Sequence, residues 1–290
     1  MDVDLTPKVS KSVYGGDGGS YFSWSPSDLP MLKEGNIGAS KIALQKNGLA
    51  MPSYSDSAKV AYILQGKGIV GIYLYEAEME KVVSIKEGDA MALPFAGEFT
   101  EFALTGANGL FTGFTTEFVK ELVGSQKGIG IIKVKDGFKM LEPKEEDLKG
   151  MVMNCLEAPL DIDIKNGGRV VLLNSKSLPL VKDVGLGADL VRIDAGSMCS
   201  PGFSCDSAYQ VTYIVRGSGR AQIVVKAGNL FIVPSFFTVS KIADGEGMEW
   251  FSIITPPNPE VLQASFNVSP EAEQHFRSKR LNAEIFFSAP

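Results

Sequence analysis

One short pattern occurs twice in this chain. It reads VAYILQGKG over Val60–Gly68 and VTYIVRGSG over Val211–Gly219. In each copy a run rich in β-branched and aromatic residues leads into a Gly-x-Gly turn, which is typical of a strand that ends in a tight connection. Turn residues recur about every eight to twelve residues around both copies, as they do in all-β sandwiches and barrels. We therefore predict a mainly all-β protein with two jelly-roll β-barrels, at residues 1–145 and 146–290.

Helical patterns are confined to two places, Thr115–Val123 and Pro259–Arg277. In the second, Ser269 suits a helix cap and Pro270 the first helical position, with acidic residues in the first turn and basic residues in the last. Each barrel is thus expected to be followed by a short helical arm. Because apolar arms of this kind commonly pack on another subunit, we expect a homo-oligomer.

Composition excludes several classes of function. The 290 residues are 44% apolar and 21% charged, which suits a soluble globular protein. A net charge of -6, with no cluster of Lys and Arg interleaved with aromatic residues, argues against nucleic acid as a partner. The longest apolar runs, such as Val170–Leu173, are far shorter than the roughly 20 residues that span a bilayer. The sequence therefore predicts no membrane partner.

The first residues, Met1–Pro7, carry acidic side chains where a signal peptide needs a basic start and an apolar core. If Met1 is the true start, the expected location is cytoplasmic. The cysteines Cys155, Cys199 and Cys205 are odd in number and irregularly spaced, so they do not predict a disulfide framework. Buried thiols are favoured, and a local bridge between Cys199 and Cys205 is left open.

A second pattern also occurs twice, a glycine followed six residues later by proline, at Gly88–Pro94 and Gly228–Pro234. The glycine permits a turn and the proline ends a strand. Together the two patterns resemble the motifs of the cupin family. That family places a pair of histidines and an acid before the first motif glycine, and a third histidine after the proline, to hold a metal.

The metal-binding positions implied by this resemblance are occupied by other residues. Lys59 and Gln210 stand in the acid positions, and Val239 stands in the third histidine position of the second barrel. The paired histidine positions read Ser53–Ser55 and Phe203–Cys205, and the one histidine, His275, lies in a polar C-terminal stretch. Because such sites need imidazole and carboxylate ligands, we expect no metal, no other cofactor and no catalysis.

A narrower resemblance, to the legumin-type (11S) seed storage globulins, is close in the second half and looser in the first. It rests on Gly168–Leu180, Gly185–Ala188, Tyr213–Gly219, Val233–Val239, Gly247–Phe251 and Ser265–Ser269. It implies a nutrient reservoir assembled as a homotrimer or hexamer, with the protein storage vacuole as the alternative location. The family's cleavage motif would begin at Asn154, but Cys155, Pro159 and Asp161 depart from that motif, so a single uncut chain is favoured.

A binding role is the alternative to storage. Inward and outward residues alternate along barrel strands, and this alternation places six residues inside the second barrel. They are Phe203, Gln210, Thr212, Ile214, Phe237 and Val239. Such a lining would suit a carrier of a small aromatic or apolar ligand, for example a plant hormone such as auxin, whereas a core packed shut would suit storage. A metal-independent enzyme, with Lys59 or Cys205 as its titratable group, is a third possibility.

The halves also differ in length. The motif glycines Gly66 and Gly88 are twice as far apart in sequence as Gly217 and Gly228. A barrel that lacked a strand pair would expose apolar edges. We therefore hypothesise that segments are missing from the chain near four residues, Phe95, Val119, Val224 and Pro259.

Overall fold

The computed structural model describes residues 4–51, 57–72, 81–94, 130–137, 142–202, 208–235, 237–255 and 286–288. Within them, three one-turn helices accompany strands, which confirms the all-β prediction. The helices are α1 (Met31–Glu34), α4 (Glu145–Leu148) and α5 (Val181–Val184). The predicted arms at Thr115–Val123 and Pro259–Arg277 lie outside the described residues. No helix in the described part of the chain is long and apolar enough to cross a membrane.

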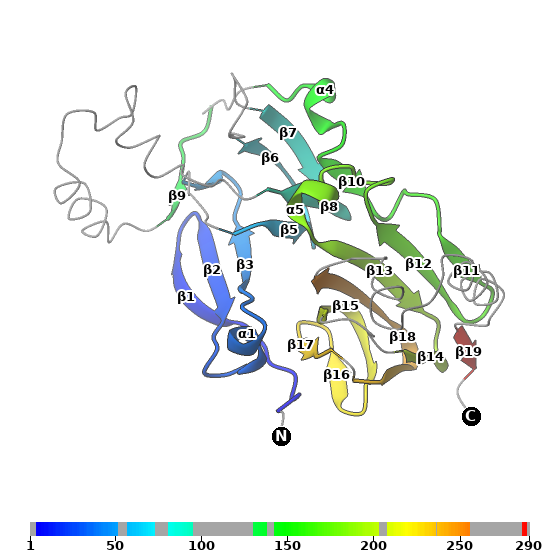
Figure 1. Cartoon of the computed structure of the whole chain (residues 1–290). Helices are drawn as coiled ribbons and strands as arrows, with labels where there is room; N and C mark the ends of the chain where they lie inside the picture. Colours follow the sequence, from blue (N-terminus) through cyan, green and yellow to red (C-terminus); the bar gives the residue numbers. More distant parts are fainter. Residues whose placement is uncertain are drawn as a thin grey trace.

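The first half, together with β10 (Val152–Asn154) from just beyond residue 145, forms four small antiparallel sheets (Figure 1). One contains β1 (Lys11–Gly16), β2 (Gly19–Trp24) and β3 (Ala39–Leu44) in that order. A second contains β5 (Lys59–Tyr62), β8 (Asp89–Leu93) and β10, with β8 in the centre. The other two are pairs, β4 (Gly48–Ala50) with β9 (Ile131–Lys133), and β6 (Lys67–Ile72) with β7 (Lys81–Lys86).

The second half forms one sheet of nine strands that curls into a barrel. Its central strands are β13 (Gly187–Ile193), β15 (Tyr209–Arg220) and the long β18 (Val239–Thr255), and β18 pairs with both of the others. The remaining strands are β11 (Ile162–Ile164), β12 (Gly168–Leu173), β14 (Ser197–Gly202), β16 (Val224–Lys226), β17 (Leu230–Val233) and β19 (Phe286–Ser288).

Successive side chains of β15 point to opposite faces of the sheet and so pack in two different cores. Ile214 points into the barrel and packs with Trp250 and Phe231, whereas its neighbour Val211 packs outside the barrel against Trp24 and Leu29. Because successive side chains of a strand point to opposite faces, one strand can supply both cores.

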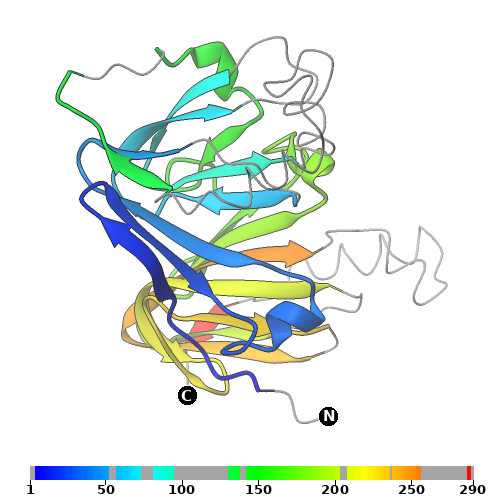
Figure 2. The same cartoon turned by 90° about the vertical axis from the view of Figure 1, so that its left-hand side faces the viewer.

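Contacts between the halves are extensive. The Tyr62 ring of the first half stacks on Phe251 of the second, with ring centroids 4.4 Å apart. In the other direction, the N-terminal segment lies along the second barrel (Figure 2), where Lys8 bridges to Leu230. The domain boundary after residue 145 stays a prediction. Of the four points of the missing-segment hypothesis, only Val224 is described, and it starts a tight hairpin opposite Arg220.

The motif glycines occupy the left-handed region of backbone conformation, with φ of 85° at Gly66 and 73° at Gly217. A Cβ at Gly66 would meet no neighbour within 4 Å, but at Gly217 it would lie 2.0 Å from the Gly247 carbonyl oxygen. We expect Gly66→Ala to cost about 1–2 kcal/mol from conformation alone, and Gly217→Ala to cost clearly more. Urea denaturation of both variants checks this, and equal losses would contradict the role of the steric clash.

Candidate functional site

The predicted lining residues of the second barrel are placed on two of its strands. Gln210, Thr212 and Ile214 lie on the inner face of β15, and Val239 packs against the same interior from the start of β18. Phe237, just before β18, is 40% exposed. Phe203 lies outside the described residues. The structure therefore brings four of the six residues toward the interior, and whether they bind a ligand stays a prediction.

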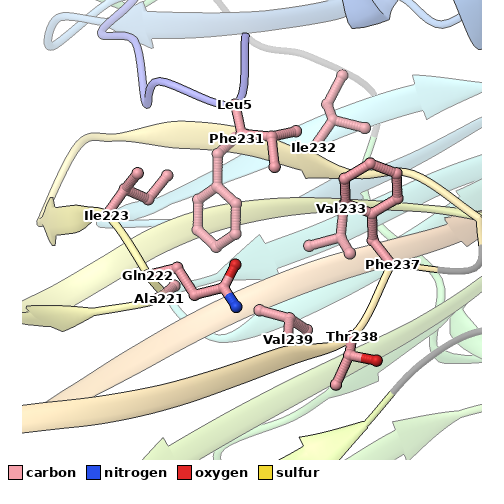
Figure 3. Close-up of a pocket in the computed structure, with 10 residues that line it drawn as sticks. All are labelled: Leu5, Ala221, Gln222, Ile223, Phe231, Ile232, Val233, Phe237, Thr238 and Val239. Atoms are coloured by element: carbon pink, nitrogen blue, oxygen red, sulfur yellow. The ribbon is translucent and has the colours of Figure 1, made fainter. Parts of the chain in front are cut away.

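One small cavity is described at an end of this barrel (Figure 3). Its lining includes Phe237 and Val239 together with Phe231 and Leu5, and it encloses about 20 Å³. That volume accommodates one or two water molecules, whereas pockets for drug-sized ligands are about 300–1,000 Å³. Deeper in the barrel, Thr212 and Ile214 are fully buried. The described interior is therefore packed by side chains.

The centre of the barrel also contains a polar layer that the sequence analysis missed. Asp189 on β13 has the same inward parity as Val191 and Ile193, and Lys241 on β18 has the same parity as Ala243. Lys241 is 4% exposed and lies opposite Cys199 of β14. The signal was present in the sequence, because a charge at an inward position of an apolar strand is unusual. Once the barrel phase is known, that charge marks a special position.

Hydroxyl and amide groups surround this charged pair. The Ser252 hydroxyl, opposite Asp189 in the sheet, lies 3.2 Å from the Thr212 hydroxyl. It also accepts a hydrogen bond from the Gln210 amide at 3.2 Å. The Lys241 ammonium lies over the Trp250 ring, 4.7 Å from its centroid, in a cation–π arrangement. Polar groups from β13, β15 and β18 therefore form one layer, and its Lys241 ammonium packs on the Trp250 ring.

Burial perturbs the ionisable groups of this layer. It raises the pKa of Asp189 to about 6, although the nearby Lys241 charge and hydrogen bonds from Ser252 favour the carboxylate. Burial lowers the pKa of Lys241, and the Asp189 carboxylate opposes that shift. Burial also raises the pKa of the Cys199 thiol. Each shift disfavours the charged form, as expected where water is excluded.

The positions that correspond to a cupin metal site do not form a ligand set in the described residues. Lys59 begins β5 and is exposed, whereas the Gln210 side-chain amide donates a hydrogen bond to the Ser252 hydroxyl. Ser53–Ser55 and Phe203–Cys205 lie outside the described residues, as does His275. Within the part of the chain that the structure describes, no three His, Cys, Asp or Glu side chains are grouped as a metal site would require.

Asn154, the start of the expected cleavage motif, is held firmly at the end of β10. Its amide donates to the Asp89 carboxylate at 2.7 Å and to the Glu87 carbonyl at 3.0 Å. Its side-chain oxygen accepts hydrogen bonds from the backbone N–H groups of Leu156 and Glu157, both at 3.0 Å. This side chain thus ties the turn after β10 to the sheet of the first half.

Replacement of Asn154 by aspartate should therefore destabilise the protein. The new carboxylate would face Asp89 without a proton to donate, so we expect Asn154→Asp to cost about 1–3 kcal/mol. Asn174→Asp is the matched control, because the Asn174 side-chain oxygen accepts, within the described residues, only from the backbone N–H groups of Lys176 and Ser177 in its exposed turn. Urea denaturation near pH 7 measures both, and equal stability of the two variants would contradict the interpretation.

Comparisons with known proteins identify the fold and its relatives. Glutelin type-D 1 of Oryza sativa subsp. japonica is 24% identical over 339 residues, which cover 75% of this chain and 70% of that protein. Cocosin 1 of Cocos nucifera is 24% identical and covers 73% and 69%. The first alignment is longer than the 290 residues of this chain, so it contains gaps.

Solved structures agree. Pumpkin seed globulin superposes with a TM-score of 0.72 at 18% identity, covering 98% of each chain. An 11S globulin from Wrightia tinctoria, whose structure is described as revealing an auxin binding site, has a TM-score of 0.66 at 19% identity and covers 93% of each chain. The predicted resemblance to seed storage globulins of the 11S type is confirmed.

The family assignment rests on a separate match. The sequence model of the family described as Cupin matches residues 6–116 and 154–284, one stretch in each half and together most of the chain. Two antiparallel β domains, the repeated glycine motifs and the globulin relatives all agree with that match. The chain belongs to the cupin family, with two cupin domains.

Proposed function

We propose that this protein is a non-catalytic nutrient reservoir, deposited as an uncut chain in a protein storage vacuole. The observation that carries the proposal is its kinship, over most of its length, to glutelin and cocosin. The packed interior of the second barrel supports it, since Thr212, Ile214 and Ser252 are fully buried and the cavity described at the barrel end encloses only about 20 Å³.

The test is the abundance of the protein during the life of a seed. A reservoir should accumulate in the vacuolar fraction of developing seeds and disappear during germination. Quantitative mass spectrometry of fractionated seeds measures both, and it also shows whether a peptide spanning Asn154 stays intact. A constant level through germination would contradict storage, and recovery in the cytosolic fraction would contradict the vacuolar location alone.

We further propose that the chain assembles as a homotrimer or hexamer. Exposed apolar side chains support self-association, because soluble monomers rarely keep contiguous apolar patches uncovered. Four such residues, Val13, Ile42, Leu44 and Ile132, lie on or beside the β1–β2–β3 sheet and are each more than 40% exposed. Native mass spectrometry should show three or six copies of the 31.1 kDa chain. A monomer at micromolar concentration would contradict the proposal.

A second candidate function is a carrier of a small ligand in the second barrel. One observation favours it: Asp189 Oδ1 and Trp250 Nε1 are buried and have no hydrogen-bond partner among the described residues. The proposed lining is Phe203, Gln210, Thr212, Ile214, Phe237 and Val239, and the auxin binding site ascribed to the Wrightia tinctoria globulin makes a small aromatic acid a reasonable guest. Comparison of native and denatured masses of gently purified protein tests it, because a carrier should lose the mass of its guest.

A further inference from the structure

Among the described residues, the second barrel contains three buried polar side-chain atoms without a hydrogen-bond partner. One of them, Glu249 Oε1, lies 3.8 Å from the Arg216 guanidinium, and the other two belong to Trp250 and Asp189 of the polar layer. Trp250 is 2% exposed, and its indole N–H donates to no acceptor in the part of the chain that the structure describes. The Oδ1 atom of Asp189 likewise accepts no hydrogen bond. Because an unpaired buried polar group is costly, native proteins contain few of them, and each calls for an explanation. Two unpaired atoms in one polar layer suggest that a bound group supplies their hydrogen-bond partners.

The charges around these atoms define what could complete the layer. Asp189 supplies negative charge on one side, and the Lys241 ammonium supplies positive charge above the Trp250 ring. An ion would leave a net charge in this water-poor interior, which is costly. A neutral dipole would not, because its negative end can face Lys241 and the Trp250 N–H while its positive end faces Asp189.

We propose that the centre of the second barrel binds a small molecule through a planar group that carries a carbonyl beside an N–H or O–H, as in a primary amide or a carboxylic acid. The carbonyl accepts from the Trp250 Nε1–H, and the N–H or O–H donates to Asp189 Oδ1. This deepens the carrier candidate above by naming the chemical class of its guest, and it leaves the storage proposal unaffected.

Size limits the guest. Thr212 and Ser252 lie fully buried next to Asp189, so the bound group enters by displacing side chains and is restricted to a few heavy atoms. Amides and acids differ in one respect. A carboxylate must take up a proton to bind beside Asp189, whose described charged and titratable neighbours are Lys241 and Cys199. Acid binding should therefore tighten as pH falls, whereas amide binding should not.

The two tryptophans of the chain make a direct experiment possible. In the full-length protein labelled with ¹⁵N, each indole gives one N–H signal in a TROSY spectrum. Trp24 is the internal control, because its Nε1 donates to the Lys8 carbonyl at 2.9 Å outside the barrel. The variants Trp24→Phe and Trp250→Phe assign the signals. Acetamide and acetate serve as the probes.

The expected result is a saturable shift of the Trp250 signal by millimolar acetamide, with the Trp24 signal unmoved and no pH dependence between pH 7 and 8, where Asp189 with its pKa of about 6 stays ionised. Acetate should produce the same shift with an affinity that rises about tenfold for each unit by which the pH is lowered in that range, since one proton is taken up. Saturation-transfer experiments should show acetamide bound to Trp24→Phe and at least tenfold weaker binding to Trp250→Phe.

Other outcomes overturn the proposal. They are the absence of a saturable shift with either probe, equal movement of both indole signals, or acetamide binding that survives in Trp250→Phe. Asp189→Asn, which keeps the shape but removes the charge, is the second variant if Trp250→Phe does not fold, and it should abolish the pH dependence of acetate binding. Failure of these tests while the protein still disappears during germination would reject the guest and leave storage standing.

Discussion

Trp250→Ala is expected to lower the free energy of unfolding by about 3–5 kcal/mol, as large-to-small changes of buried aromatic residues do. Trp250 is 2% exposed and packs with Ile214 and Met248 in the barrel core. Its removal would leave a cavity and also deprive the Lys241 ammonium of the ring beneath it. Both effects destabilise the folded state.

Urea denaturation near pH 7 measures the Trp250→Ala effect, with Val224→Ala as the control. Val224 is 73% exposed, so its truncation should change stability by less than about 0.5 kcal/mol. A Trp250→Ala loss as small as that of the control would mean that the barrel interior is not packed as described.

The second large effect is expected from Lys241→Met, which leaves Asp189 without its nearby positive charge. Breaking a buried charge pair by removing one partner typically costs about 3–5 kcal/mol, whereas replacing both partners by apolar residues is often nearly neutral. The double variant Lys241→Met with Asp189→Leu should therefore recover most of the loss. A double variant less stable than Lys241→Met alone would contradict a coupled pair.

The cost of Lys241→Met should also depend on pH. The folded-state pKa of Asp189, about 6, lies above its ordinary value of 3.8, so its contribution to stability is fully present below about pH 4 and is lost as pH rises through 6. Without Lys241, this pKa rises further. We therefore expect Lys241→Met to be much less destabilising at pH 5 than at pH 8, and equal losses at the two values would contradict the charge argument.

Much of the fold follows from local sequence pattern. The paired Gly-x-Gly and glycine–proline motifs predicted two β domains, because turn glycines and strand periodicity depend on residues close together in the chain. The alternation of β15 also placed Gln210, Thr212 and Ile214 on the inner face. These are short-range rules, and the structure follows them.

The polar layer could not be predicted in the same way. Asp189 and Lys241 are far apart in sequence, and their proximity depends on which strands pair and in which register. Likewise, Trp24 and Leu29 resemble ordinary core residues of the first half, yet they pack on Val211 and Leu230 of the second. Sequence periodicity identifies which residues are buried, but it does not identify their partners.

The position of the N-terminal segment has a consequence for biosynthesis. The apolar side chains around α1, including Met31 and Leu32, are covered by Val211 and Ile232, which leave the ribosome much later. Domains usually fold as units in the order of their synthesis. Here the segment around α1 can complete its packing only after β15 and β17 have been synthesised. Until those strands have been synthesised, the apolar face of this segment lacks the partners that cover it in the folded protein, which would not be so in a pair of independent barrels.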